Sequence, residues 1–164
     1  MHALCFLRRF CPALLLLLLS GCGFALRDSA DLPTALQTMI VAGEEENGEL
    51  LQEVRRALRN SGVTIVEADS PYVLRIGRES SGERVVSVNS NARAGEYELE
   101  MNLPFQLLQG GTAVLGPDTV SLSRVYLTDP ENAVAKEEEA ELIRSELRRE
   151  LAQQLLRRLQ VAPL

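Results

Sequence analysis

The segment EYELEMNLPFQLLQ, residues 96–109, decides the fold class because its side chains alternate between apolar and polar. Between residues 96 and 107 every odd position is apolar and every even position is polar or proline. Successive side chains of a strand point to opposite faces of a sheet, so the pattern predicts a strand with one buried face and one wet face. Pro104 lacks an amide donor, which indicates an edge or bulge position.

Shorter strands are expected on both sides of this segment, at residues 38–42, 63–68, 72–77, 83–89 and 119–127. The two strands at 72–77 and 83–89 are separated by the turn ESSG and are expected to form a hairpin. Near Arg124 the alternation of the last strand is broken, which suggests a bulge.

Two helices complete the expected fold. In residues 49–62 the apolar side chains recur at helical spacing on one face, and they are Leu50, Leu51, Val54 and Leu58. The final helix is expected to start at Asp129 and Pro130, and its apolar stripe is Ala140, Ile143, Leu147, Leu151 and Leu155. We therefore predict an α+β fold, a two-layer sandwich of two amphipathic helices on one face of a mixed, mainly antiparallel sheet of four to five strands.

The amino-terminal leucine run is typical of an export signal. It follows Arg8 and Arg9, and its roughly ten apolar residues are fewer than the ~20 needed to span a bilayer. A buried core helix would show polar residues at helical spacing, and the run has none.

The sequence LSGC, residues 19–22, matches the lipobox of bacterial lipoproteins. The thiol of Cys22 would take a diacylglyceryl group, and the new amino terminus could be acylated as well. The alternative is an ordinary signal with an incidental cysteine. We expect a signal peptide at 1–21, an acylated cysteine and short tether at 22–36, and a single domain at 37–164. Gly23, where lipoproteins retained in the inner membrane typically carry Asp, favours the outer membrane.

Composition argues against enzymatic chemistry in the mature chain. His2, Cys5 and Cys11 lie in the signal, so after cleavage no histidine remains and Cys22 is the one cysteine. These absences exclude histidine-based catalysis, a cysteine-cluster metal site and a disulfide within the chain. With 23 acidic residues and 17 basic ones before cleavage, a general nucleic-acid surface is not expected either. A carboxylate enzyme using Glu98 and Glu100 is the weakest reading, since alternating surface acids are common on strands.

Three motifs in collinear order resemble a known family. They are GCGFALRD at 21–28, GEYEL at 95–99 and DPENAVAK at 129–136. Together they resemble the LPS-assembly lipoprotein family, LptE, over nearly all of the mature chain. The fold that this resemblance implies, two helices on a four-stranded sheet, agrees with the pattern-based prediction.

The resemblance implies a lipid-anchored role without catalysis in Gram-negative envelope biogenesis. LptE-like proteins are outer-membrane lipoproteins that plug the large β-barrel LptD, assist its assembly and bind lipopolysaccharide (LPS) on its way to the outer leaflet. The domain would face the periplasm and lie inside the barrel lumen. No cofactor is implied beyond the acyl chains on Cys22. The alternative is a free periplasmic lipoprotein that carries a lipid or small ligand without a barrel partner.

Two basic positions of the family contact LPS, and one of them matches Lys136, the only lysine of the chain. A cation near a helix start is mildly unfavourable, which favours a functional role over a merely solvated lysine. The second position, an arginine in the family, falls on Ser90 here. Arg93 lies three residues later and could replace it, because a guanidinium binds phosphate well, or it could be an ordinary surface arginine.

Overall fold

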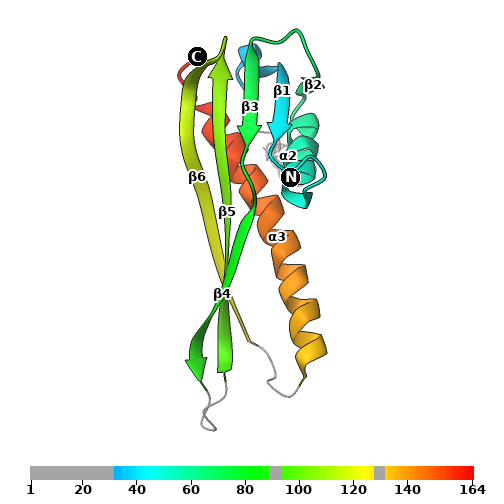
Figure 1. The fold of residues 1–164 in the computed structure, drawn as a ribbon, viewed down its shortest axis with the longest axis vertical. Coiled ribbons are helices and arrows are strands. Elements are labelled where there is room, and N and C mark those ends of the chain that lie inside the picture. The colour runs from blue at the N-terminus through cyan, green and yellow to red at the C-terminus, as the bar shows by residue number, and fades with distance from the viewer. Residues whose placement is uncertain (1–31, 89–93, 128–131) are drawn as a thin grey trace, which may run out of the picture.

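A computed structural model describes residues 32–88, 94–127 and 132–164 and confirms the α+β class (Figure 1). Two helices pack on a mixed sheet of six strands, where four to five were expected. In chain order the elements are η1 (Thr34–Leu36), β1 (Thr38–Gly43), α2 (Glu49–Asn60), β2 (Thr64–Val66), β3 (Tyr72–Ile76), β4 (Ser80–Val88), β5 (Ala94–Gln109), β6 (Thr112–Leu127) and α3 (Ala133–Gln160). The molecule is elongated because β5, β6 and α3 run along its length.

Strand β5 organises the sheet. Strand β6 pairs antiparallel with one edge of β5 along almost its whole length. The other edge of β5 pairs with β3 at one end and with β4 at the other. Strand β1 lies outside β3 and is parallel to both β2 and β3.

The predicted hairpin of residues 72–77 and 83–89 is therefore wrong. Strands β3 and β4 are both antiparallel to β5, so they run in the same direction, whereas a hairpin needs antiparallel strands. They follow one another along a single edge because β5, at 16 residues, is long enough to pair with both in turn.

Pro104 lies at the break between β3 and β4. The β3 pairing ends at Ile76 opposite Phe105, and the β4 pairing begins at Ser80 opposite Asn102. The Pro104 carbonyl accepts a hydrogen bond from the Gly77 amide at 2.9 Å. The amide and carbonyl of one strand residue point to the same side, so the amide hydrogen that proline lacks would also point toward this break. A proline is thus accommodated inside an interior strand, and not at the sheet edge.

The core lies between the helices and one face of the sheet. The predicted apolar face of β5 is buried at Leu99, Met101, Leu103, Phe105 and Leu107, and Tyr97 is half-buried. All the predicted apolar positions of the two helices are buried as well: Leu50, Leu51, Val54, Leu58, Ala140, Ile143, Leu147, Leu151 and Leu155. Leu36 is also fully buried, so packing against the core begins no later than η1.

The expected bulge at Arg124 is not present. Arg124 pairs in register with Leu99, and its neighbours Leu122 and Tyr126 pair with Met101 and Tyr97 on the same face. The guanidinium reaches Glu146 and Glu150 of α3, so an ion pair takes the place of an apolar contact and the alternation continues. The register shift of β6 instead lies near Gly116 and Pro117, opposite Phe105–Leu107.

Helix α3 begins at Ala133, later than expected. The side-chain oxygen of Asn132 accepts a hydrogen bond from the Ala135 amide at 3.1 Å and caps the helix. Asp129 and Pro130, the expected start, lie outside the described residues. In the part of the chain that the structure describes, neither helix is long and apolar enough to cross a membrane.

Candidate functional site

Lys136 lies in the first turn of α3, where the helix meets the far ends of β4, β5 and β6. Its Nζ donates a hydrogen bond to Oε1 of Glu83 on β4 at 2.5 Å. The same nitrogen lies 3.7 Å from the centroid of the Tyr97 ring on β5. The side chain of Lys136 keeps 28 % of its surface exposed, so it remains accessible from solvent.

Tyr126 of β6 completes what we name the Lys136 cluster, formed by Glu83, Tyr97, Tyr126 and Lys136. The Tyr126 hydroxyl donates a hydrogen bond to Oε2 of Glu83 at 2.7 Å, so both carboxylate oxygens of Glu83 are engaged. The rings of Tyr97 and Tyr126 stack with centroids 5.8 Å apart. Residues from four elements meet in this cluster, which joins the first turn of α3 to the sheet.

The charges of the cluster stabilise one another. Burial opposes ionisation of Glu83, but the hydrogen bonds from Lys136 and Tyr126 outweigh burial, and the pKa of Glu83 lies below its ordinary value. The hydrogen bond to Glu83 raises the pKa of Lys136 despite some desolvation. Burial, followed by the hydrogen bond to Glu83, raises the pKa of Tyr126 well above its ordinary value. The unfavourable position of a cation at the helix start is therefore compensated by Glu83 and the Tyr97 ring.

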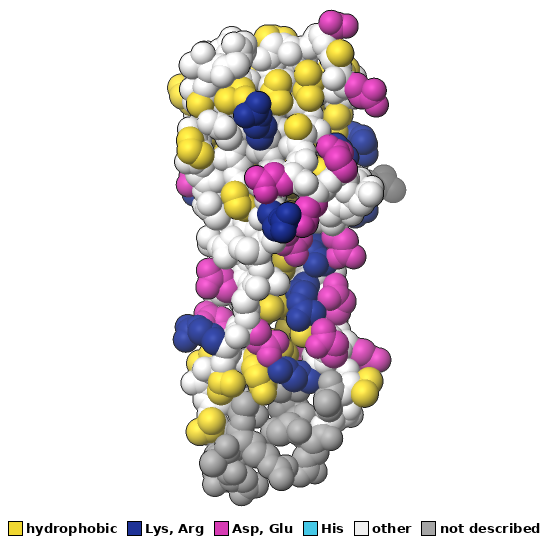
Figure 2. Space-filling model, viewed as in Figure 1, with side chains coloured by type: hydrophobic (Ala, Val, Ile, Leu, Met, Phe, Trp, Pro, Cys, Tyr) yellow, Lys and Arg dark blue, Asp and Glu magenta, His cyan; other side chains and the backbone are white. Residues whose placement is uncertain are grey.

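Exposed apolar side chains are found on β4, on β6 and in the first turn of α3. We name them the distal apolar set, which comprises Val85, Val86, Val88, Val125, Leu127 and Val134. Val125 and Leu127 pair with Glu98 and Glu96, so they lie on the sheet face opposite Tyr97 and Tyr126. Figure 2 shows hydrophobic side chains at the lower end of the molecule, where these elements lie. Leu127 and Val134 are both 69 % exposed.

This arrangement suits the binding of an anionic ligand. A lysine ammonium attracts a phosphate or carboxylate, and exposed apolar side chains nearby suit the hydrocarbon part of an amphiphile. The four residues of the cluster are a glutamate, two tyrosines and a lysine. Within residues 32–88, 94–127 and 132–164, no group of acids, histidines and cysteines could hold a metal ion.

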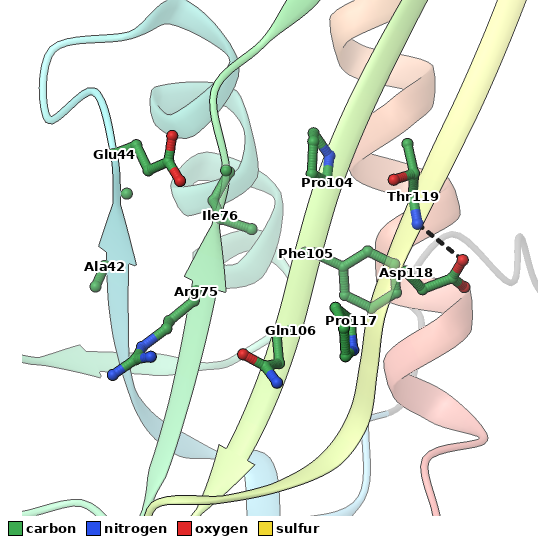
Figure 3. Close-up of a pocket in the computed structure, with 12 residues that line it drawn as sticks. Ala42, Glu44, Arg75, Ile76, Pro104, Phe105, Gln106, Pro117, Asp118 and Thr119 are labelled. Carbon is green, nitrogen blue, oxygen red and sulfur yellow. Dashed lines mark hydrogen bonds between the residues drawn. The ribbon is translucent and has the colours of Figure 1, made fainter.

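A second feature is a hollow of about 590 Å³ near the other end of the sheet. It is lined by residues of β1, β3, β5 and β6, and Figure 3 shows Arg75 and Gln106 on neighbouring strands with Pro117 beside them. Along β5 the hollow lies roughly 25 Å from Tyr97, at about 3.3 Å per residue. The hollow and the Lys136 cluster are therefore separate sites.

Of the residues predicted to be lipidated or to contact LPS, Lys136 alone lies in the described chain, and Glu98 and Glu100, the weakest catalytic candidates, lie on β5. Cys22, Ser90 and Arg93 fall outside it, so lipidation and the second basic contact remain predictions. Glu83 and Tyr126 were missed as partners of Lys136. The expected strand at 83–89 begins at Glu83 but was paired with the wrong neighbour, and the expected strand at 119–127 gave no specific role to Tyr126.

Comparison with known proteins identifies the family. A sequence model described as LptE: Lipopolysaccharide-assembly matches residues 36–159. The chain belongs to the LPS-assembly lipoprotein LptE family. It is 38 % identical over 152 residues to the LPS-assembly lipoprotein LptE of Yersinia enterocolitica, covering 90 % of this chain and 72 % of that protein. For the Yersinia pestis protein of the same name, the identity is 37 % over 150 residues, covering 89 % of this chain and 72 % of the relative.

Solved structures agree with the fold. The crystal structure of rare lipoprotein B from Shewanella oneidensis is 33 % identical, with a TM-score of 0.67 over 73 % of this chain and 91 % of that chain. The solution structure of a lipoprotein B from Nitrosomonas europaea is 20 % identical, with a TM-score of 0.69 over 84 % of this chain and 90 % of that one, and it supports the fold alone. The chain is thus a member of a lipoprotein family that takes part in LPS assembly in the bacterial envelope.

Proposed function

We propose that this LptE-family protein binds LPS at Lys136, plugs an LptD-like β-barrel in the outer membrane and assists insertion of LPS into the outer leaflet. Cys22 carries the acyl chains that hold it on the membrane, with the domain facing the periplasm and inside the barrel lumen. The protein needs no cofactor or metal and performs no catalysis. Family membership supports the role in LPS assembly, and the Lys136 cluster supports the contact with LPS.

The partly exposed ammonium of Lys136, at the end of the molecule where the distal apolar set also lies, carries the proposal. LPS presents phosphates on an acylated sugar, so its ligand chemistry combines negative charge with hydrocarbon. The chain offers one lysine, partly exposed, and β4, β6 and α3 carry exposed valines and one exposed leucine. Arg93 precedes β5 by one residue in the sequence and would supply a second, guanidinium contact to phosphate.

The test is LPS binding by the purified, full-length mature protein in detergent. Lys136→Gln removes the charge and keeps most of the length, so we expect binding to weaken by about tenfold, as for a charge-assisted hydrogen bond. Arg149→Gln is the matched control, because Arg149 is exposed on the same helix about 20 Å further along its axis. We expect this control to bind like the wild type. Equal binding by both variants and the wild type would contradict the assignment of Lys136.

A second candidate function is a lipoprotein that carries a small ligand without a barrel partner. The hollow near Arg75 and Gln106 favours it, since its volume is in the range of small-molecule pockets. Purification of the protein from native membranes separates the two functions, because a carrier would be recovered without a β-barrel.

A further inference from the structure

We infer that Glu83 acts as an internal counterion that competes with LPS phosphate for Lys136 and thereby limits the affinity of the site. This inference rests on the proposed function and names a residue that sets the specificity of the same site. It predicts that neutralising an acid will strengthen the binding of an anion.

The geometry places the carboxylate where a ligand phosphate would compete. A lysine ammonium has three donors, and here one is used by Glu83 at 2.5 Å while the Tyr97 ring lies 3.7 Å away. A phosphate that approaches Nζ meets an ammonium already paired with a carboxylate, and the negative charge of that carboxylate repels it. Binding must therefore displace Glu83 from Lys136 or tolerate two anions beside one cation.

Glu83 is held in place independently of Lys136. The Tyr126 hydroxyl donates to its second oxygen at 2.7 Å, and Tyr126 is itself buried at 5 % exposure. The Glu83 side chain is only 25 % exposed, so solvent does not fully screen its charge. The carboxylate would thus remain near the site after Lys136 turned to a ligand.

A second cation near the cluster, Arg144, is paired with acids of its own helix. Arg144 lies close enough to lower the pKa of Glu83, but its guanidinium binds Glu137 at 3.0 Å and Glu141 at 3.1 Å on α3. Removing the charge of Glu83 therefore changes mainly the availability of Lys136.

The experiment compares Glu83→Gln with the wild type, using full-length mature protein in detergent and LPS with or without its phosphates. We expect Glu83→Gln to bind phosphorylated LPS about two- to fivefold more tightly, the range of a partly exposed ion pair. In the double variant with Lys136→Gln this gain should vanish. Dephosphorylated LPS should bind the wild type and Glu83→Gln equally.

Two further variants separate charge from packing. Tyr126→Phe removes a hydrogen bond to Glu83 but keeps both charges, so its affinity should stay within about twofold of the wild type. Glu83→Asp retains the charge on a shorter side chain, so its gain should be smaller than that of Glu83→Gln. If the Glu83→Gln variant is too unstable to purify, Glu83→Asp provides the test. Tighter LPS binding than that of the wild type supports the inference, and equal or weaker binding contradicts it.

Outcomes for the two proposals are distinct. If Lys136→Gln weakens binding but Glu83→Gln binds no better than the wild type, the counterion inference is wrong and the LPS site stands. If Lys136→Gln has no effect, both are wrong.

Discussion

The ammonium of Lys136 lies over the face of the Tyr97 ring, 3.7 Å from its centroid, and so ties the first turn of α3 to the central strand of the sheet. The contact spans 39 positions of sequence between two elements whose connection includes β6. Tyr97 also stacks on Tyr126, so one ring serves both the strand pairing and the helix contact.

Replacing Tyr97 tests this contact. Tyr97→Leu removes the π system under the ammonium and the stacking on Tyr126, and we expect it to lower the free energy of unfolding by about 1–2 kcal/mol. Tyr97→Phe keeps both and should cost less than about 0.5 kcal/mol. Urea denaturation of the two variants measures the difference. Equal losses would show that the ring contributes only apolar volume.

Acidification should weaken the Lys136 cluster through Glu83. Its pKa is lowered in the folded state, so its contribution to stability is present above the ordinary value of 4.5 and is lost as pH falls through the folded-state pKa. Glu83→Gln removes that contribution at every pH. The stability difference between wild type and Glu83→Gln should therefore shrink from about pH 7 to about pH 3. Denaturation at the two pH values measures it, and a constant difference would contradict the linkage.

Gly77 should not tolerate a side chain. A Cβ at Gly77 would lie 2.9 Å from the Cβ of the rigid Pro104 ring, at the break between β3 and β4. We expect Gly77→Ala to destabilise the fold by about 1–3 kcal/mol through overpacking. Gly82 on β4 is the matched control, because a Cβ there has no atom of the described chain within 4 Å. Thermal denaturation should show a lower Tm for Gly77→Ala and an unchanged or slightly higher one for Gly82→Ala.

Lipidation of Cys22 should decide membrane attachment. Cys22→Ser prevents acylation, and each buried methylene of an acyl chain contributes about 0.8 kcal/mol to membrane binding. We expect the wild type in the membrane pellet of cell fractions and the variant in the soluble fraction. Retention of the variant in the pellet, after a high-salt wash, would contradict a lipid anchor as the main attachment.

Much of the fold followed from periodicity. The strand at 96–109 and both apolar helix faces were predicted because burial on one side leaves a repeat that local sequence shows directly. Strand pairing was harder to predict. Strands β3 and β4 are consecutive and separated by a short turn, which is typical of a hairpin, and only the length of β5 allows both to pair with it in turn. Arg124 was misread as a bulge because its partners Glu146 and Glu150 lie on a helix far along the chain.

The candidate site was only partly predictable for the same reason. Lys136 stood out as a single lysine near a helix start, and that observation needed no structure. Its engagement with Glu83 depends on a contact 53 positions away, which no local pattern indicates. The lysine that the sequence singled out is therefore partly exposed, but its ammonium already forms an ion pair with Glu83.

The most direct test of the central claim is affinity purification of the full-length, lipidated protein from native membranes in mild detergent, with partners identified by mass spectrometry. We predict a stable complex with a large outer-membrane β-barrel of the LptD type. Recovery of the protein without a barrel, from an envelope in which that barrel is present and folded, would contradict the proposed function.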